Sequence, residues 1–283
     1  MDGIIVVNKP KDYTSRDVVN KVCKILNTKK VGHTGTLDPI ATGVLVLCVG
    51  KATKLVEILT SNDKEYIAEV KLGVLTDTLD TDGNIIKEDN NRTSKDKLIE
   101  VLNSFIGTYN QEVPIYSAVK INGKKLYEYA RNNKEVELPR RMVEIKNIEL
   151  LDYDVNNYKF KVTVSKGTYI RSLIKDINDK LGIIGVMSSL KRTRQGKFNI
   201  KESCTIEDIE VGNYSIKTIT NVLKDENCVI INEQLYNVIK NGGLIPNIYN
   251  KDTVTFIYED NVIAIYKTYI KDITKMKPYK MFI

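Results

Sequence analysis

The chain has 283 residues, enough for one large domain or for one domain with a small appendage. Its composition, 42% hydrophobic and 28% charged, is that of a globular protein with a sizeable core. Lys and Arg outnumber Asp and Glu by 43 to 36, giving a formal charge of +7. This excess suits a polyanionic partner such as nucleic acid, but it is also common among proteins without one.

The cysteine pattern and the apolar runs exclude several classes. The four cysteines have no CxxC spacing and the chain has one histidine, which argues against a disulfide framework or a zinc site. No basic region followed by a long apolar stretch opens the chain, and no apolar run approaches the roughly 20 residues of a membrane span. We expect a cytoplasmic protein with reduced thiols, no membrane contact and no metal.

The first part of the chain mixes strand and helix patterns. Residues 4–7 predict a short buried strand, and residues 14–17 (TSRD) form a capping box that starts a helix. Residues 44–49 are a second apolar run, either a strand or the start of a buried helix. In residues 64–72 apolar side chains alternate, which predicts a half-buried strand with Tyr66 on its buried face.

The middle of the chain continues this mixture. Residues 93–96 cap a second helix, which Gly107 closes. Strands are expected at 143–151 and 158–165, and residues 170–181 have the spacing of an amphipathic helix. Because strands and helices follow no regular βαβ rhythm, we predict an α+β fold with a mixed, largely antiparallel central sheet.

The pattern changes after about residue 205. Short strands are expected at 228–231, 253–258 and 262–266, with turn sequences between them. They form a β-rich unit of about 55 residues, too small to be comfortable alone and therefore expected to pack on the main body. We predict a main domain at residues 1–226 and a small C-terminal domain at residues 227–283.

The most informative segment is residues 31–43 (VGHTGTLDPIATG). It holds three glycines, the single histidine His33 and one acid, Asp38. Pro39 fixes its own φ and disfavours helix at the residue before it, so the carboxylate lies on a stiff turn. A purely structural turn rarely needs this combination. We interpret the segment as an active-site loop with Asp38 as the candidate nucleophile.

Two further segments offer partners for this acid. Tyr66 lies at the start of an alternating strand, where a half-buried core tyrosine is the commoner case. Residues 165–171 (SKGTYIR) join a strand end to a helix start and place Tyr169 and Arg171 at a sheet edge, where sites are often built. Arg171 is either a solvated surface charge or a partner that keeps Asp38 ionised and oriented.

Cations and aromatic residues recur in two other segments. Residues 191–197 carry four cations, including Arg192, and residues 114–131 interleave tyrosines with basic residues such as Lys120. Such a mixture suits phosphate contacts and base stacking on RNA, although charged runs are more often solvated faces. Asp77, Asp80 and Asp82 hint at a calcium loop, but its twelfth position would be Asp89 rather than Glu.

At these residues the chain resembles the TruB family of tRNA pseudouridine synthases. The shared motifs are collinear, and they lie at Asn8-Lys9-Pro10 and at residues 32–39, 64–66, 116–118, 124–131, 165–171 and 190–198. The C-terminal unit resembles the family's small PUA-like RNA-binding domain. The resemblance implies the pseudouridine synthase fold.

The resemblance also implies an activity. A protein without metal or other cofactor would isomerise uridine 55 in the T loop of tRNA to pseudouridine. Nothing in the sequence suggests more than a monomer. The N-glycosidic bond breaks, the uracil rotates, and a C–C bond forms at the same ribose. In the family, the aspartate matching Asp38 is the nucleophile, the arginine matching Arg171 pairs with it, and the tyrosine matching Tyr66 stacks on the target base.

Other residues are expected to contact the RNA. The histidine matching His33 belongs to the loop that helps extrude the target nucleotide, and residues matching Tyr169 and Leu190 line the pocket. A base in a folded loop must be flipped before it can react, and an aromatic face replaces its lost stacking. The remaining candidates for RNA contact are the basic residues Lys9, Lys120 and Arg192.

Three other functions stay open at this point. A non-catalytic tRNA-binding folding chaperone on the same scaffold would keep its role after Asp38→Asn. A guide-RNA-directed relative is disfavoured by the short C-terminal unit and the absence of long basic tails. A glycoside hydrolase would need a second catalytic acid, and no comparable acid-bearing loop stands out. The sequence also leaves open whether Asp38 attacks C1′ or C6.

Overall fold

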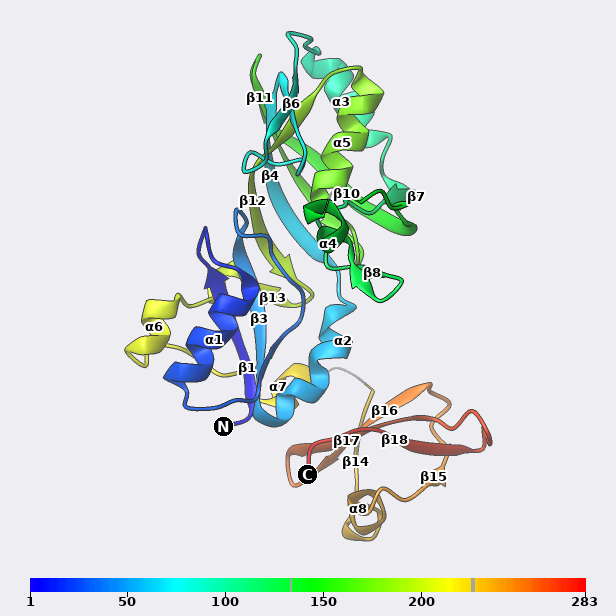
Figure 1. Cartoon of the computed structure of the whole chain (residues 1–283). Helices are drawn as coiled ribbons and strands as arrows, with labels where there is room; N and C mark the ends of the chain where they lie inside the picture. Colours follow the sequence, from blue (N-terminus) through cyan, green and yellow to red (C-terminus); the bar gives the residue numbers. More distant parts are fainter. Residues whose placement is uncertain (133, 225–226) are drawn as a thin grey trace.

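The computed structural model of the chain describes residues 1–132, 134–224 and 227–283 (Figure 1). Among these residues, one large sheet contains nine strands. Its main path runs, in spatial order, through β1 (Gly3–Lys9), β3 (Thr42–Val49), β12 (Gly185–Gln195), β4 (Lys64–Leu72), β11 (Asn157–Val164), β10 (Arg140–Tyr153) and β7 (Gly107–Glu112). Two short strands join this path, β2 (Val31–His33) on β3 and β13 (Phe198–Asn199) on β12.

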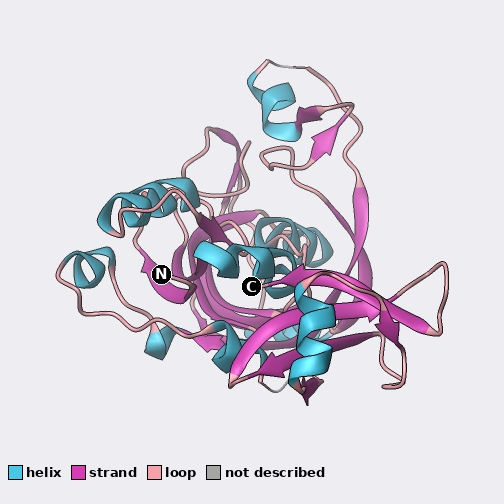
Figure 2. Cartoon of the chain, turned by 90° about the horizontal axis from the view of Figure 1, so that it is seen from below, coloured by secondary structure: helices cyan, strands magenta, loops and turns pink. Residues whose placement is uncertain are grey.

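Strand direction confirms the predicted fold class. Within the described residues every pairing in this sheet is antiparallel except that of β12 with β3, which is parallel. Helices lie around strongly curved strands (Figure 2). The fold is therefore α+β with a mixed, mostly antiparallel sheet, and the apolar run at 44–49 is strand rather than helix.

The helices and the shorter strands fill in the remaining order. The α-helices are α1 (Ser15–Ile25), α2 (Val56–Thr60), α3 (Lys95–Asn103), α4 (Leu126–Arg131), α5 (Ile170–Leu181), α6 (Ile206–Glu210), α7 (Ile219–Leu223) and α8 (Glu233–Lys240), with 3-10 turns at Gly50–Leu55 and Ile200–Glu202. Two small hairpins pair β5 (Val74–Thr76) with β6 (Ile85–Glu88) and β8 (Lys120–Ile121) with β9 (Lys124–Lys125). In the described residues, no helix is long and apolar enough to cross a membrane.

Helix α1 packs on the part of the sheet formed by β1 and β3, on either side of the Asp38 loop in the sequence. Its predicted capping box is present, because Thr14 accepts from the Asp17 N–H and the Asp17 carboxylate accepts from the Thr14 N–H. The buried Val18 and Val22 pack with Leu45 and other side chains of β1 and β3. Each such side chain contributes about 1.5–3 kcal/mol through burial. This packing fixes β3, the strand that follows the Asp38 loop, and its neighbour β1.

Helix α5 covers the other half of the sheet and has the predicted bounds. Leu173 and Ile177 are fully buried and belong to one core cluster with Leu98 of α3 and Phe160 of β11. The helix ends at Gly182, whose φ of +71° is the left-handed cap that glycine adopts most readily. Because this face is packed, the first turn of α5 has a fixed position at the edge of the sheet.

One predicted helix end is wrong. Helix α3 is capped by Ser94, close to the expected start, but it ends at Asn103. Gly107, expected to close it, begins strand β7 with a φ of +113°. The glycine serves the turn into the strand, and the helix has already ended through backbone hydrogen bonds at Ser104.

The C-terminal unit contains a five-stranded sheet of its own. The spatial order is β14 (Cys228–Ile230), β16 (Thr253–Tyr258), β17 (Asn261–Thr268), β18 (Lys275–Met281) and β15 (Ile245–Pro246). Strand β18 and helix α8 had not been expected. Val262 and Phe282 share a core cluster with Val46 and Leu55, so this unit packs on the main body, as predicted. The predicted boundary at 226 falls outside the described residues, and the two-domain division stays a prediction.

Candidate active site

Four segments far apart in the sequence enclose one cavity. The loop between β2 and β3, the start of β4, the start of α5 and strand β12 surround a volume of about 190 Å³. Six of the predicted site residues line it: Asp38, Tyr66, Tyr169, Leu190, Arg171 and Arg192. The fold therefore brings together residues that the sequence could only place in separate motifs.

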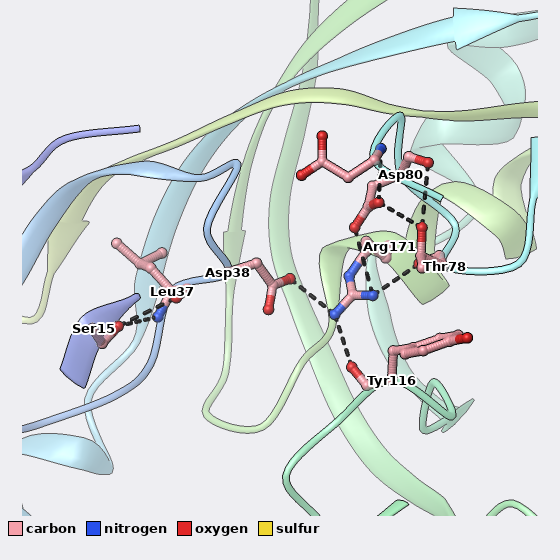
Figure 3. A network of polar contacts seen from close by, with 8 residues as sticks. Ser15, Leu37, Asp38, Thr78, Asp80, Tyr116 and Arg171 are labelled. Atoms are coloured by element: carbon pink, nitrogen blue, oxygen red, sulfur yellow. Dashed lines mark hydrogen bonds and ion pairs between the residues drawn. The ribbon is translucent and has the colours of Figure 1, made fainter. Parts of the chain in front are cut away.

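Asp38 forms the ion pair that we had expected. Its Oδ2 lies 2.9 Å from Nη2 of Arg171 (Figure 3). The Arg171 side chain is only 5% exposed, whereas the Asp38 side chain is 40% exposed. The guanidinium therefore orients the carboxylate from the protein side and leaves part of the acid open to the cavity.

Arg171 is held by groups that the sequence did not single out. Its Nη1 donates to the Thr78 carbonyl at 2.8 Å and its Nη2 to the Tyr116 carbonyl at 3.0 Å. The Asp80 Oδ2 lies 3.7 Å from Nη1, and the Thr78 hydroxyl donates to the other Asp80 oxygen (Figure 3). A buried guanidinium is stable only with such partners. In the sequence, Asp80 could have been found through the acidic turn of Asp77, Asp80 and Asp82, which does not fit a calcium loop.

The same turn gives no sign of a metal centre. Within the described parts of the chain, no group of three or more His, Cys, Asp or Glu side chains could hold an ion. Asp80 is instead 9% exposed and faces Arg171. Its neighbour Asp77 accepts hydrogen bonds from Asn84 across the turn.

The residue before Asp38 is fixed by helix α1. The Leu37 N–H donates to the Ser15 hydroxyl at 2.8 Å, and this hydroxyl donates to the Leu37 carbonyl at 3.2 Å (Figure 3). The Asp38 carbonyl then accepts from the Ala41 N–H at 3.0 Å, which closes a turn. The loop backbone is thus held on both sides of the catalytic candidate.

Lys9, predicted to contact RNA, is fully buried. Its Nζ donates to the carbonyls of Pro10, Tyr13 and Pro39, at 2.8, 2.5 and 3.2 Å. Burial lowers the pKa of Lys9 to about 8, although the nearby Asp38 carboxylate acts in the opposite direction. In this position the ammonium group supports the loop directly after Asp38.

Arg192, also predicted to contact RNA, is 1% exposed. Its Nε donates to the Val44 carbonyl at 2.6 Å, its Nη2 to the Gly35 carbonyl at 3.1 Å and its Nη1 to the Thr36 carbonyl at 3.4 Å. Gly43 lies opposite, where β3 and β12 run parallel. A Cβ on Gly43 would come within 2.2 Å of the Arg192 carbonyl oxygen, so this approach requires glycine.

Tyrosine and leucine side chains form the apolar walls. Tyr66 is 7% exposed, and its strand β4 pairs with β11 on one side and β12 on the other. Leu190 is 6% exposed. Tyr169 is held through its backbone by Gln111, which accepts from its N–H at 2.8 Å and donates to its carbonyl at 3.1 Å. Gln111 is fully buried and had not been identified from the sequence.

Besides Lys9, two other predicted residues lie outside this cavity. His33 is half-buried in β2, and its Nδ1 accepts from the Gly35 N–H at 3.3 Å. Burial, together with the charges of Arg16 and Arg192, lowers the pKa of His33, which favours the neutral ring. Lys120 is exposed on β8.

The cavity is strongly positive. Lys64, Lys166, Arg171 and Arg192 line it, against one carboxylate, Asp38. Lys64 donates to the carbonyls of Thr60 and Asn62, both at 2.6 Å, and burial lowers its pKa to about 8. Walls of this charge and an aromatic face suit a nucleotide, whose phosphate is anionic and whose base can stack.

Comparisons with known proteins agree with this chemistry. Residues 23–170 match the family model "TruB family pseudouridylate synthase (N terminal domain)", and residues 171–227 match "tRNA pseudouridylate synthase B C-terminal domain". Relatives named tRNA pseudouridine synthase B include those of Oceanobacillus iheyensis, 43% identical over 100% of this chain and 98% of the relative, and of Fusobacterium nucleatum, 42% identical over all of both chains.

A solved structure gives the same result for the fold. A chain from the crystal structure of a Cbf5-Nop10-Gar1 complex superimposes with a TM-score of 0.75 at 29% identity, covering 99% of this chain and 85% of that chain. The two family models match consecutive stretches of the chain, and the curated relatives align along its whole length. This chain therefore belongs to the TruB family of pseudouridylate synthases.

Proposed function

We propose that this protein isomerises uridine 55 in the T loop of tRNA to pseudouridine, with Asp38 as the nucleophile. The observation that carries the proposal is the Asp38–Arg171 ion pair at the wall of a positive cavity. A half-exposed carboxylate held by a buried guanidinium can be aimed at a carbon atom of the substrate. The family membership and the relatives named for tRNA support the reaction and the substrate class.

The reaction follows from these side chains. The Asp38 oxygen attacks either C1′ or C6 of the flipped nucleotide, and the N1–C1′ bond breaks. The uracil turns within the cavity, C5 bonds to C1′, and the bond to the Asp38 oxygen breaks, which frees the carboxylate. The proton on C5 is lost, and N1 gains one. Atoms and electrons balance, since substrate and product are isomers. Tyr66 offers the aromatic face on which the base rests, and Leu190 closes the wall.

The supporting parts have separate tasks in this proposal. Arg171 orients Asp38, while Lys64 and Lys166 attract the phosphate backbone of the tRNA. We assign Tyr169, His33 and the exposed Lys120 to contacts with the tRNA. Lys9 and Arg192, which are buried, would act on RNA only through the loop they hold.

We further propose a cytoplasmic monomer that needs no metal, because all groups in the scheme come from one chain. Residues 1–226 would carry the chemistry, and residues 227–283 would form a small RNA-binding domain. The latter rests on basic groups beside a half-buried aromatic ring, since the ammonium groups of Lys267 and Lys280 lie 4.8 and 4.6 Å from the ring centre of Tyr279.

The test is direct. The purified protein is incubated with an unmodified tRNA transcript and pseudouridine is mapped by position, with Asp38→Asn as the matched variant. We expect pseudouridine at position 55 with the wild type and none with the variant. Conversion at another position, or equal conversion by Asp38→Asn, would overturn the assignment. A folding chaperone would instead restore misfolded tRNA equally well with both proteins.

A further inference from the structure

We propose that Arg192 and Gln195 of β12 are positioning residues, which clamp the backbone of the loop that carries Asp38, and that Arg192 does not bind tRNA phosphate. The inference rests on the isomerase function proposed above and adds to it two residues that act through Asp38. It also replaces the role that the sequence suggested for Arg192.

The clamp holds three consecutive carbonyls. Gln195 donates from Nε2 to the Thr34 carbonyl at 3.2 Å and to the Thr34 hydroxyl at 2.6 Å. Arg192 donates to the next two carbonyls, those of Gly35 and Thr36. These residues lie just before Asp38 in the chain. Each carbonyl of this stretch therefore accepts a hydrogen bond from a side chain of a strand that follows it by about 160 positions.

A β-bulge makes this arrangement possible. In a regular strand, side chains three positions apart point to opposite faces. Here the register of β12 on β4 shifts between Arg192 and Arg194, so that Thr193 is an extra residue. As a result both Arg192 and Gln195 point inward and are 1% and 0% exposed. Bulges of this kind commonly re-aim side chains beside active sites.

The chemistry of Arg192 fits clamping better than phosphate binding. Its Nε, Nη1 and Nη2 all donate to protein carbonyls from three nitrogens spread over one plane. An ammonium also has three donors, but they lie on one nitrogen and cannot reach the same three carbonyls. With 1% of its surface exposed, it offers almost no area that a phosphate could reach. Its three bonds instead join the loop to β3 through the Val44 carbonyl.

The clamp determines the position of the Asp38 carboxylate. The carboxylate must meet both Arg171 and a carbon atom of the substrate, and a misplacement of about 1 Å can cost roughly 100-fold in rate. Loosening Gly35 and Thr36 would allow such a shift without removing any group that touches the RNA. The clamp should therefore affect the chemical step and leave tRNA affinity unchanged.

The experiment compares Arg192→Lys with Arg92→Lys. Arg92 also donates to protein oxygens, those of Asn91 and Asn156, but it does not line the cavity. For each variant we would measure the single-turnover rate at saturating tRNA and the Kd for tRNA at several salt concentrations. We expect Arg192→Lys to lower the rate about 10- to 100-fold, with Kd and its salt dependence unchanged. Arg92→Lys should change neither quantity.

Removing the charge of Arg192 distinguishes clamping of the loop from binding of a phosphate. For Arg192→Gln, a phosphate contact predicts weaker binding, a salt slope smaller by about 1 and an unchanged saturating rate. That result would overturn the proposal, as would a wild-type rate in Arg192→Lys. If Arg192→Gln does not fold, Gln195→Met tests the other half of the clamp, and it should also lower the rate without changing Kd.

A second measurement does not depend on activity. Hydrogen exchange in a peptide covering residues 34–38 reports on the loop backbone, including the Leu37 N–H held by Ser15. We expect faster exchange there in Arg192→Lys and in Gln195→Met, but not in Arg92→Lys. If wild type made no pseudouridine, the proposed function would fail while this result still tested the clamp. Unchanged exchange in both clamp variants would refute it.

Discussion

Two segments contact Arg171, and different groups hold them in place. One is the loop that carries Asp38, and the other is the excursion, which comprises the described part of residues 113–139 between β7 and β10. In the loop, buried side chains bind the carbonyls before and after Asp38. The excursion is closed at its base by one backbone bond, from the Val113 N–H to the Pro139 carbonyl, and meets Arg171 through the Tyr116 carbonyl.

Their surfaces differ as well. The cations beside the loop, Lys9 and Arg192, are buried and bonded to carbonyls. In the excursion, Lys120 is exposed, and Lys125 and Arg131 each lie 5.3 Å from the ring centre of Tyr127. The difference suggests a division of labour, in which a fixed loop supplies the chemistry and the excursion supplies affinity for RNA. Variants in the two regions should therefore affect different measured quantities.

The sharpest test of this division is Asp38→Asn. The amide keeps the shape of the side chain but loses the charged nucleophile, so we expect the single-turnover rate to fall by about 10⁴-fold or more. The Kd for tRNA should stay within about threefold, since binding rests on other groups. A variant that lost affinity and rate together would show that loop chemistry and RNA binding are not separate.

Arg171→Lys tests the residue that both regions share. A lysine cannot keep the bonds to Asp38, Thr78 and Tyr116 together, so we expect a loss of roughly 100-fold in rate. Asp80 would also lose its partner, and the thermal unfolding temperature should fall. The control Lys175→Arg lies on the same helix in an exposed pair with Asp179 and should leave both rate and stability unchanged.

A smaller effect is expected in the excursion. Lys120→Ala should weaken tRNA binding severalfold and reduce the slope of log Kd against log salt concentration by about 1, with the saturating rate unchanged. Lys159→Ala is the matched control, because this lysine is paired with Glu69 on the sheet, away from the cavity. A lower saturating rate in Lys120→Ala would show that the excursion takes part in the chemical step. It would contradict the division of labour between the two regions.

The sequence predicted the elements and part of the site for reasons that are visible in the structure. Strand β4 and helix α5 have the predicted bounds, because one face of each is buried and the apolar spacing records that burial. The pairing of Asp38 with Arg171 was also expected, and it is present at 2.9 Å. The element bounds are local patterns within one segment, whereas the ion pair joins two segments and was expected from the family resemblance.

The remaining features depend on contacts between distant segments. A basic residue in a charged run reads as exposed, and nothing local indicated that Arg192 would be buried by a bulge at Thr193. Likewise, the burial of Lys9 requires the carbonyl of Pro39, which only the folded loop provides. Asp80 became recognisable as a partner of Arg171 once the sheet had brought the acidic turn to helix α5.

The smallest predicted effect concerns Lys64, the cation at the cavity wall whose pKa burial lowers to about 8. In the unfolded chain this lysine titrates near its ordinary value of 10.5, so between pH 8 and 10.5 the unfolded state binds more protons. The contribution of Lys64 to the free energy of unfolding therefore rises with pH over this range. Below pH 8 its buried charge opposes folding.

Lys64→Met removes this titration while keeping an unbranched side chain. The unfolding temperature of the wild type minus that of the variant should increase as the pH rises from 7.5 to 10. Thermal unfolding in one buffer series measures this difference. Lys175→Met, at an exposed lysine, should show no such trend. A difference independent of pH would mean that Lys64 keeps its proton in the folded state, and that the cavity remains fully charged in alkaline solution.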